Sequence, residues 1–84
     1  MKYFVYILYS KTLNRFYIGS TENIGRRVEQ HNKPHRGYTS SGQPWDLVYS
    51  EPLSSKKEAL SRERSIKEKK SKKFIEHMIA SLDA

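Results

Sequence analysis

Two stretches of sequence decide the fold: YFVYILY at residues 3–9 and RFYIG at residues 15–19. Both are rich in aromatic and β-branched residues, which favour strands. In the first stretch the odd-numbered and the even-numbered side chains are all apolar or aromatic. We therefore expect a central strand that is covered on both faces. Residues 11–14, KTLN, predict a turn that returns the second strand antiparallel to the first.

The middle of the chain predicts a helix, a loop and a third strand. The helix is expected to start among the capping residues 20–23 and to run to about Asn32, before Pro34. Residues 33–44 are polar and rich in Gly, Ser and Pro, so we expect a long loop there. Residues 45–50, WDLVYS, alternate between apolar and polar side chains and predict a strand.

The last part of the chain predicts two further helices. Ser55 and Glu58 are spaced as a capping box at the start of the first of them, which is expected to run to about Lys70. Ser71 is expected to cap the next helix, whose apolar residues recur at helical spacing. The sequence thus predicts a single α+β domain over residues 1–84, with a small three-stranded antiparallel sheet flanked by three helices. The predicted order is strand, strand, helix, strand, helix, helix.

Composition limits the classes of function. The 84 residues include 16 Lys and Arg against nine Asp and Glu, a net charge of +7, which favours polyanionic partners. On charge alone, a surface with many lysines explains the surplus equally well. The absence of cysteine excludes disulfides, thiolate zinc sites and a cysteine nucleophile. It is typical of a cytoplasmic protein. No stretch approaches the roughly 20 apolar residues of a membrane span, so we expect no membrane partner.

Glu63 is a carboxylate on or beside the apolar side of its predicted helix. It follows Ala59 by four residues and precedes Ile66 by three. A carboxylate there needs a cation or hydrogen bonds. One interpretation is an ion pair with one of the nearby basic residues, namely Arg27, Arg62, Arg64 or Lys67. The other is a ligand for Mg²⁺, which usually takes one or two protein carboxylates and keeps several waters.

Further polar groups are brought together by the predicted elements. Arg27 and His31 are four residues apart on one helix face. They are either ordinary surface residues or a phosphate-binding guanidinium beside a proton acceptor. Tyr6 and Tyr17 fall in adjacent strands and are either core tyrosines or a pair that orients a water or a phosphate oxygen. Gly19 ends the second strand, where a missing side chain would let a substrate approach.

The order and spacing of these residues resemble the GIY-YIG nuclease superfamily, in particular its small stand-alone bacterial members. The resemblance covers nearly the whole chain. It is carried by residues 5–6 (VY), 17–19 (YIG), 23–27 (NIGRR), 38–39 (YT), 44–49 (PWDLVY) and the helix 58–63 with its glutamate. The sequence departs from the family pattern at Phe4, where the first motif has glycine, and at Ser20, where some members have lysine.

The resemblance implies a metal-dependent endonuclease that hydrolyses phosphodiester bonds. The catalytic residues it implies are Tyr6, Tyr17, Arg27, His31 and Glu63. Glu63 would hold a single Mg²⁺ or Mn²⁺, Arg27 would neutralise charge on the phosphoryl group, and a tyrosine, with help from His31, would act on the attacking water.

The implied substrate is DNA, and the implied role is DNA repair or recombination. Because no base-reading helix is predicted, we expect contacts to the backbone and selection of branched or single-stranded regions. The expected contact residues are Gly19, Ser20, Lys33, Arg36, Lys67 and Lys70. No separate DNA-binding domain is expected, so a protein partner would supply targeting.

Two alternatives remain open at this point. The first is a nucleic-acid-binding module that has the nuclease fold but little or no cleavage activity. The second is a purely structural interaction domain in which Glu63 and Arg27 form a buried ion pair.

Overall fold

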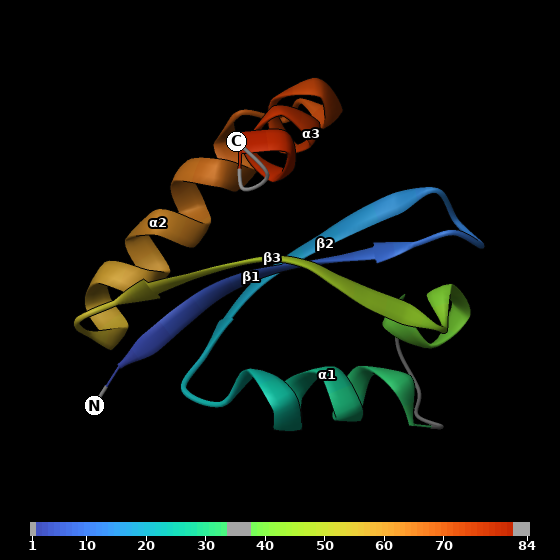
Figure 1. Ribbon diagram of the computed structural model, residues 1–84, viewed down its shortest axis with the longest axis horizontal. Coiled ribbons are helices and arrows are strands. Elements are labelled where there is room, and N and C mark those ends of the chain that lie inside the picture. The colour runs from blue at the N-terminus through green and yellow to red at the C-terminus, as the bar shows by residue number, and fades with distance from the viewer. Residues whose placement is uncertain (1, 34–37, 82–84) are drawn as a thin grey trace.

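The computed structural model describes residues 2–33 and 38–81. Its elements are β1 (Tyr3–Ser10), β2 (Arg15–Thr21), α1 (Ile24–Asn32), the 3₁₀ helix η1 (Tyr38–Gly42), β3 (Trp45–Leu53), α2 (Lys56–Glu68) and α3 (Lys72–Ser81) (Figure 1). The predicted α+β class, the antiparallel sheet and the order of strands and α-helices are confirmed.

The sheet has the order β2-β1-β3, so β1 is the central strand, as predicted. Both neighbours are antiparallel to it, and Tyr6 lies opposite Gly19 of β2 and Ser50 of β3. The register with β3 shifts between Ile7 and Leu8. Such a bulge adds a residue to one strand and changes the direction of its side chains. The strand β2 is left as an edge, with one lateral side open.

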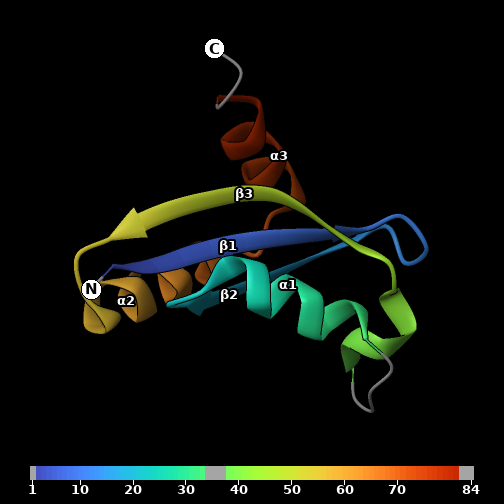
Figure 2. The ribbon, with the colours of Figure 1, turned by 60° about the horizontal axis from the view of Figure 1, so that its bottom comes forward.

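The helices cover both faces of the sheet. Figure 2 shows α1 on one face, while α2 and α3 lie on the other. The face toward α2 and α3 is packed with aliphatic side chains that include Val5, Ile7 and Ile66. The face toward α1 is packed around Tyr6, Leu8 and Trp45. Residues on both faces of β1 are therefore buried, which explains why its sequence shows no polar face.

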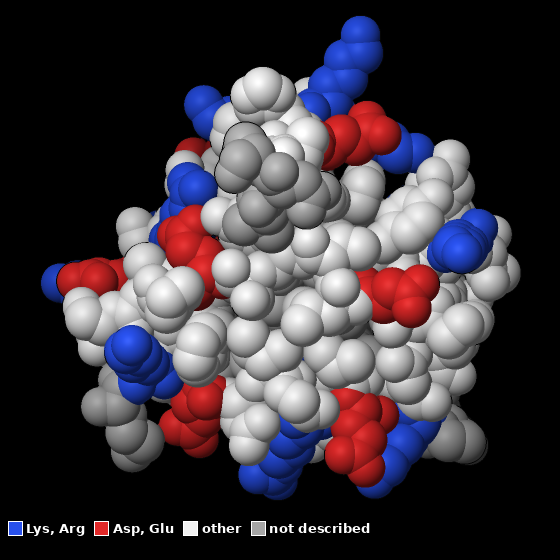
Figure 3. Space-filling model, in the orientation of Figure 1, with Lys and Arg blue, Asp and Glu red and all other residues white. Residues whose placement is uncertain are grey.

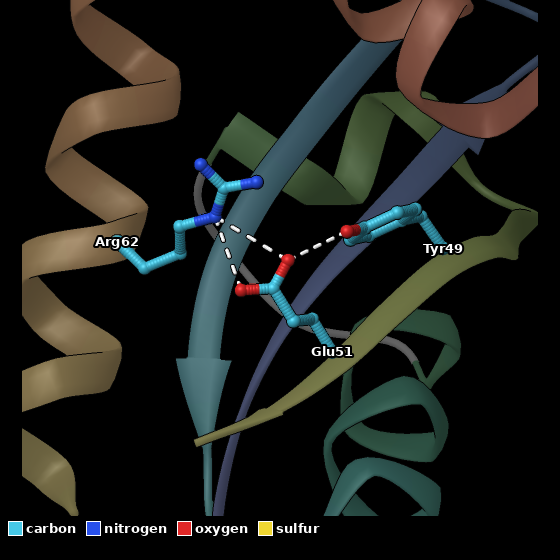
Figure 4. A network of polar contacts seen from close by, with 3 residues as sticks. All are labelled: Tyr49, Glu51 and Arg62. Atoms are coloured by element: carbon cyan, nitrogen blue, oxygen red, sulfur yellow. Dashed lines mark hydrogen bonds and ion pairs between the residues drawn. The ribbon is translucent and has the colours of Figure 1, made fainter. Parts of the chain in front are cut away.

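A polar network anchors α2 to the sheet (Figure 4). Arg62 Nε donates to both carboxylate oxygens of Glu51, at 3.3 and 3.1 Å. The hydroxyl of Tyr49 donates to Glu51 Oε1 at 2.6 Å. Burial, together with this hydrogen bond to Glu51, raises the pKa of Tyr49 above its usual value. The network thus fixes α2, the helix that also carries Glu63, to the sheet.

Capping residues start the helices close to where the sequence predicts. Asn23 caps α1 by accepting a hydrogen bond from the Arg26 amide at 3.0 Å, and Ser71 Oγ accepts one from the Phe74 amide at 3.2 Å. Ser55 accepts from the Glu58 amide at 3.1 Å, as in a capping box. The return bond differs from the prediction, because the Glu58 carboxylate accepts from Ser54 and not from Ser55.

Three boundaries differ from the prediction. The strand β2 continues past Gly19 to Thr21, so this glycine lies within the strand and not at its end. The segment expected to be loop contains η1, a short helix without the apolar periodicity that would reveal it in the sequence. The strand β3 continues beyond Ser50, through Pro52, to Leu53. Proline is tolerated there because β3 is an edge strand and one row of its amides needs no partner in the sheet. Among the described helices, none combines the length and the apolarity needed to cross a bilayer.

Candidate active site

Three rings meet on the α1 face of the sheet: Tyr6 of β1, Tyr17 of β2 and His31 of α1. Tyr6 Oη lies 3.2 Å from His31 Nε2, within hydrogen-bond distance. The Tyr17 ring lies 4.8 Å from that of His31 and 6.4 Å from that of Tyr6, between centroids. Trp45 packs against Tyr17 at 6.2 Å. The fold thus brings together three residues that the sequence singled out separately.

Gly19 makes room for Tyr6. The two residues lie opposite each other in the register of β1 and β2. A Cβ atom on residue 19 would lie 2.5 Å from Tyr6 Oη and 2.7 Å from Tyr6 Cζ, too close for either to remain in place. The sequence suggested that a substrate approaches over Gly19, whereas in the structure the phenol ring of Tyr6 occupies that space. The hydroxyl of this buried tyrosine consequently lies over the edge strand.

Two opposite charges act on the Tyr6 hydroxyl, one from each side of the sheet. Burial is the largest influence and raises the pKa of Tyr6 well above its usual 10.0; Tyr17 and Glu63 raise it further, and Arg27 lowers it. Arg27 belongs to α1 and Glu63 to α2. Tyr6 therefore remains a neutral phenol at neutral pH, with a guanidinium and a carboxylate close enough to influence it.

Glu63 forms an ion pair on its own helix. Lys67 Nζ lies 2.7 Å from Glu63 Oε2; the Lys67 side chain is 52% exposed and that of Glu63 is 18% exposed. One of the ion pairs suggested by the sequence is therefore present. Within residues 2–33 and 38–81, Arg27 forms no ion pair, so the buried Arg27–Glu63 pair of the structural alternative is absent.

A divalent metal fits this carboxylate. The described part of the chain holds no group of three or more His, Cys, Asp or Glu side chains that could bind a metal ion together. Glu63 would thus be the one protein carboxylate, which suits Mg²⁺ because that ion keeps several waters and often binds substrate phosphates. Lys67 is half exposed and flexible, so it can move away when a cation takes its place.

Two adjoining clefts border the site. The first has a volume of about 400 Å³ and lies between α1 and α2, with Ser20 and Arg27 in its lining. The second has a volume of about 430 Å³ and is lined by α2 residues that include Glu63 and Lys67 and by Lys70 beyond its end. Leu60 lines both. Arg27 and Glu63 therefore lie in neighbouring clefts, while Tyr6 and Tyr17 line neither.

The geometry and the sequence agree with a known family. The model of the GIY-YIG catalytic domain matches residues 2–76. This chain belongs to the GIY-YIG family. It is a family of nuclease domains, which implies a nucleic-acid substrate.

Similar GIY-YIG chains carry family names that state no activity. The chain is 43% identical over 67 residues to the UPF0213 protein SH2523 of Staphylococcus haemolyticus, a match that covers 79% of this chain and 80% of that protein. It is 41% identical over 68 residues to the UPF0213 protein DP2720 of Desulfotalea psychrophila, covering 79% of this chain and 61% of that protein. The solution NMR structure of the UPF0213 protein BH0048 from Bacillus halodurans is similar with a TM-score of 0.59 and 30% identity, over 95% of this chain and 84% of that chain.

The expected DNA contacts of the GIY-YIG domain lie in different places. Ser20 lines the first cleft, and Lys67 and Lys70 line the second. Lys33, at the end of α1, forms an ion pair with Glu29 at 3.1 Å. Arg36 lies outside the described residues.

A brace at the end of α1 was not predicted from the sequence. The Asn32 side chain donates to the Trp45 carbonyl at 3.0 Å and accepts from the Trp45 amide at 2.6 Å. The Gln43 side chain donates to the carbonyl oxygens of His31 and Lys33 at 2.8 and 2.6 Å. Together they hold the turn of α1 that carries His31. One signal was available: Asn32 follows Val28 by four residues, which places a polar side chain on the same side of the helix as that apolar one.

Proposed function

We propose that this GIY-YIG domain is a structure-selective DNA endonuclease that hydrolyses phosphodiester bonds with one divalent metal ion and acts in DNA repair or recombination. One observation carries the proposal. The buried Tyr6 hydroxyl lies against His31 and is influenced by Arg27 from one face of the sheet and by Glu63 from the other. A proton acceptor, a phosphate-binding cation and a metal-binding carboxylate are the groups that metal-assisted phosphodiester hydrolysis needs.

Glu63 would hold Mg²⁺ or Mn²⁺. When bound, such an ion polarises the scissile phosphate and stabilises the leaving oxygen. The carboxylate lies at the second cleft and is partly shielded from solvent. This shielding strengthens its attraction for a cation. Lys67, which pairs with Glu63, would have to give up this ion pair for the carboxylate to hold a metal ion, and its ammonium group could then contact a phosphate of the substrate.

Arg27 would bind the reacting phosphoryl group. Its guanidinium forms no ion pair with any described residue and lines the first cleft. Its fork of N–H donors matches phosphate oxygens and neutralises the charge that develops on them in the transition state. It approaches from α1, whereas Glu63 approaches from α2, so the phosphate would lie between the two helices at the edge of the sheet.

Tyr6 would pass a proton from the attacking water to His31. A tyrosine with a raised pKa is a poor base when it acts alone. As the water oxygen bonds to phosphorus and the bond to the leaving oxygen breaks, the water proton goes to Tyr6 Oη. The proton already on Tyr6 goes to His31 Nε2, 3.2 Å away, and the leaving oxygen takes a proton from solvent. Tyr17 packs against His31 and keeps its ring in position.

A cleavage panel tests the proposal. Single-stranded, duplex and branched DNA are incubated with the protein and Mg²⁺ or Mn²⁺, and product lengths are measured. We expect branched or partly single-stranded DNA to be cut, and Glu63→Gln to reduce the rate at least about 100-fold, as loss of a transition-state stabilising group does. Glu76→Gln, an exposed carboxylate change on α3, is the control and should cut as the wild type does. Equal cleavage rates for the wild type and Glu63→Gln would contradict the proposed metal-dependent endonuclease activity.

The ion pair between Lys67 and Glu63 favours a second candidate, a DNA-binding module that does not cut. If the carboxylate stays neutralised by Lys67, the catalytic metal has no ligand. The same panel distinguishes the two candidates. Binding of the oligonucleotides at low salt, without cleavage in either metal, would establish the module and exclude the nuclease.

A further inference from the structure

The first cleft carries unpaired positive charge. Arg26 and Arg27 of α1 and Lys56 of α2 line it, and none of the three forms an ion pair within residues 2–33 and 38–81. One acidic residue, Glu22, is also part of the lining. The other described residues around the cleft are mostly uncharged hydrogen-bonding groups, among them Ser20 and Gln30. Cations on two opposing helices and hydroxyl and amide groups between them are suited to an anion with several oxygens.

Other surfaces are less suited to a polyanion. On the face that carries β3, basic and acidic side chains alternate around an uncharged centre (Figure 3). The second cleft is lined by three cations, Arg64, Lys67 and Lys70, against two carboxylates, and one of these, Glu63, already pairs with Lys67. Of the two clefts beside the catalytic residues, the first therefore has the larger excess of positive over negative side chains.

We propose that the first cleft binds the phosphodiester next to the scissile one, on an unpaired DNA strand, with Arg26 and Lys56 as its two cationic contacts. The inference rests on the proposed function, because Arg27 lies in the same lining and would hold the scissile phosphate. Arg26 is its neighbour on α1, and Lys56 faces both from the first turn of α2. Consecutive phosphates of one strand would then contact consecutive cations along the cleft.

The size of the cleft and the apolar side chain beside it favour an unpaired strand. A volume of about 400 Å³ is typical of a site for one small organic molecule, so it suits one nucleotide unit. Leu60 is 45% exposed and lies between the two clefts. An apolar side chain at that point can contact the sugar or the base of an unpaired nucleotide, which is not stacked within a duplex. These features agree with cleavage at branches, flaps or ends, where a strand is unpaired.

The test measures binding without cleavage. A fluorescent single-stranded oligonucleotide and a duplex of the same length are titrated with protein in EDTA over a range of salt concentrations. Arg26→Gln and Lys56→Gln are compared with Arg15→Gln, at the far end of β2, and Lys57→Gln, the exposed neighbour of Lys56 on α2. All four residues are exposed, so each variant is expected to fold as the wild type does, which thermal unfolding verifies.

We expect Arg26→Gln and Lys56→Gln each to weaken single-strand binding about twofold to fivefold at low salt. Each should also reduce the slope of log affinity against log salt by about 0.7, the value for one lost phosphate contact on a single strand. The two control variants should keep the wild-type slope. Slopes for Arg26→Gln and Lys56→Gln equal to those of the controls would overturn the proposal. Equal losses on duplex and single strand would overturn the assignment to an unpaired strand.

The same series separates this inference from the proposed function. Glu63→Gln should bind the single strand at least as tightly as the wild type in EDTA, because it removes a negative charge and releases Lys67, although it no longer cuts. One outcome is that the wild type cuts no DNA, while Arg26→Gln and Lys56→Gln still reduce the salt slope. That outcome would exclude the proposed nuclease activity and support the binding cleft. If the wild type cuts DNA but the salt slopes of the two variants equal that of the wild type, the nuclease activity is supported and the assignment of the cleft is excluded.

Discussion

At the scale of single residues, Tyr6 links every part of the site. It is 1% exposed, its hydroxyl reaches His31, and its ring fills the space above Gly19. Arg27 and Glu63 both affect the pKa of this hydroxyl, so the hydroxyl lies within electrostatic reach of both charged groups. A side chain so constrained should be sensitive to changes in what it packs against.

Replacing Gly19 by alanine should displace Tyr6. The added methyl group would lie 2.5 Å from Tyr6 Oη. We expect a loss of about 1–3 kcal/mol in the free energy of unfolding, the usual cost of overpacking, and loss of cleavage. Urea unfolding and the cleavage panel measure both. Gly25→Ala is the matched control, because its new Cβ would lie 3.8 Å from Asn23 Oδ1, an ordinary van der Waals contact. That change should leave stability equal or slightly higher. A Gly19→Ala protein as stable and active as the wild type would contradict the packing described.

The raised pKa of Tyr6 predicts a specific dependence of stability on pH. The native fold favours the neutral phenol, so its contribution is fully present below the usual pKa of 10.0 and is lost as pH rises toward the higher native value. Tyr6→Phe cannot ionise and should not share this loss. The difference in unfolding free energy between the two proteins should therefore shrink by up to about 1.4 kcal/mol per pH unit above pH 10. Urea unfolding between about pH 9 and pH 11 measures it. A constant difference would rule out the raised pKa.

Lys67 should compete with the metal for Glu63. Lys67→Met removes the ammonium group 2.7 Å from the carboxylate but keeps an unbranched side chain. We expect tighter binding of Mn²⁺, measured by electron paramagnetic resonance of the free ion. Lys57→Met, on the same helix but away from Glu63, should not change it. Weaker Mn²⁺ binding by Lys67→Met would mean that the metal does not bind at Glu63.

At the scale of elements, the end of α1 is held by hydrogen bonds that were not predicted from the sequence. Asn32→Ala leaves the amide and the carbonyl of Trp45 without their side-chain partner. We expect a loss of about 1–3 kcal/mol in the free energy of unfolding, the net contribution of two hydrogen bonds. Slower cleavage should accompany it, because His31 is released. Glu29→Ala, an exposed change in the same helix, should cost far less. Equal stability of the two variants would show that the brace is not needed.

The elements differ in how well the sequence predicts them. The strands β1 and β2 and their pairing follow from aromatic and β-branched patterns, and the starts of α1 and α3 follow from Asn23 and Ser71. The extension of β3 through Pro52 depends on its position at the edge of the sheet, which is a tertiary fact. The brace made by Asn32 and Gln43 joins segments whose contact depends on the folded chain, and local patterns carry no information on it.

At the scale of the whole molecule, the candidate site lies where two helices from opposite faces approach β2, an edge strand of the small sheet. The types and spacing of Tyr6, Arg27 and Glu63 left ordinary structural roles open, and only the family resemblance predicted catalytic ones. The fold brings Arg27 and Glu63 close enough to Tyr6 to shift its pKa. The sequence also gives a net charge of +7 without indicating where it acts. The distribution follows from folding, which pairs Lys67 with Glu63 and leaves Arg26 and Lys56 unpaired within the described chain.

The central claim is that Arg27 and Glu63 belong to one catalytic centre that hydrolyses DNA. Single-turnover cleavage of a branched DNA, in Mg²⁺ or Mn²⁺, tests it most directly for the wild type, Arg27→Ala, Glu63→Gln and the double variant. We predict that each single change slows cleavage about 100-fold to 1,000-fold. The double variant should be little slower than the slower single variant, because both groups act in the same step. Single variants that cut at the wild-type rate, or losses that multiply fully in the double variant, would contradict a shared centre.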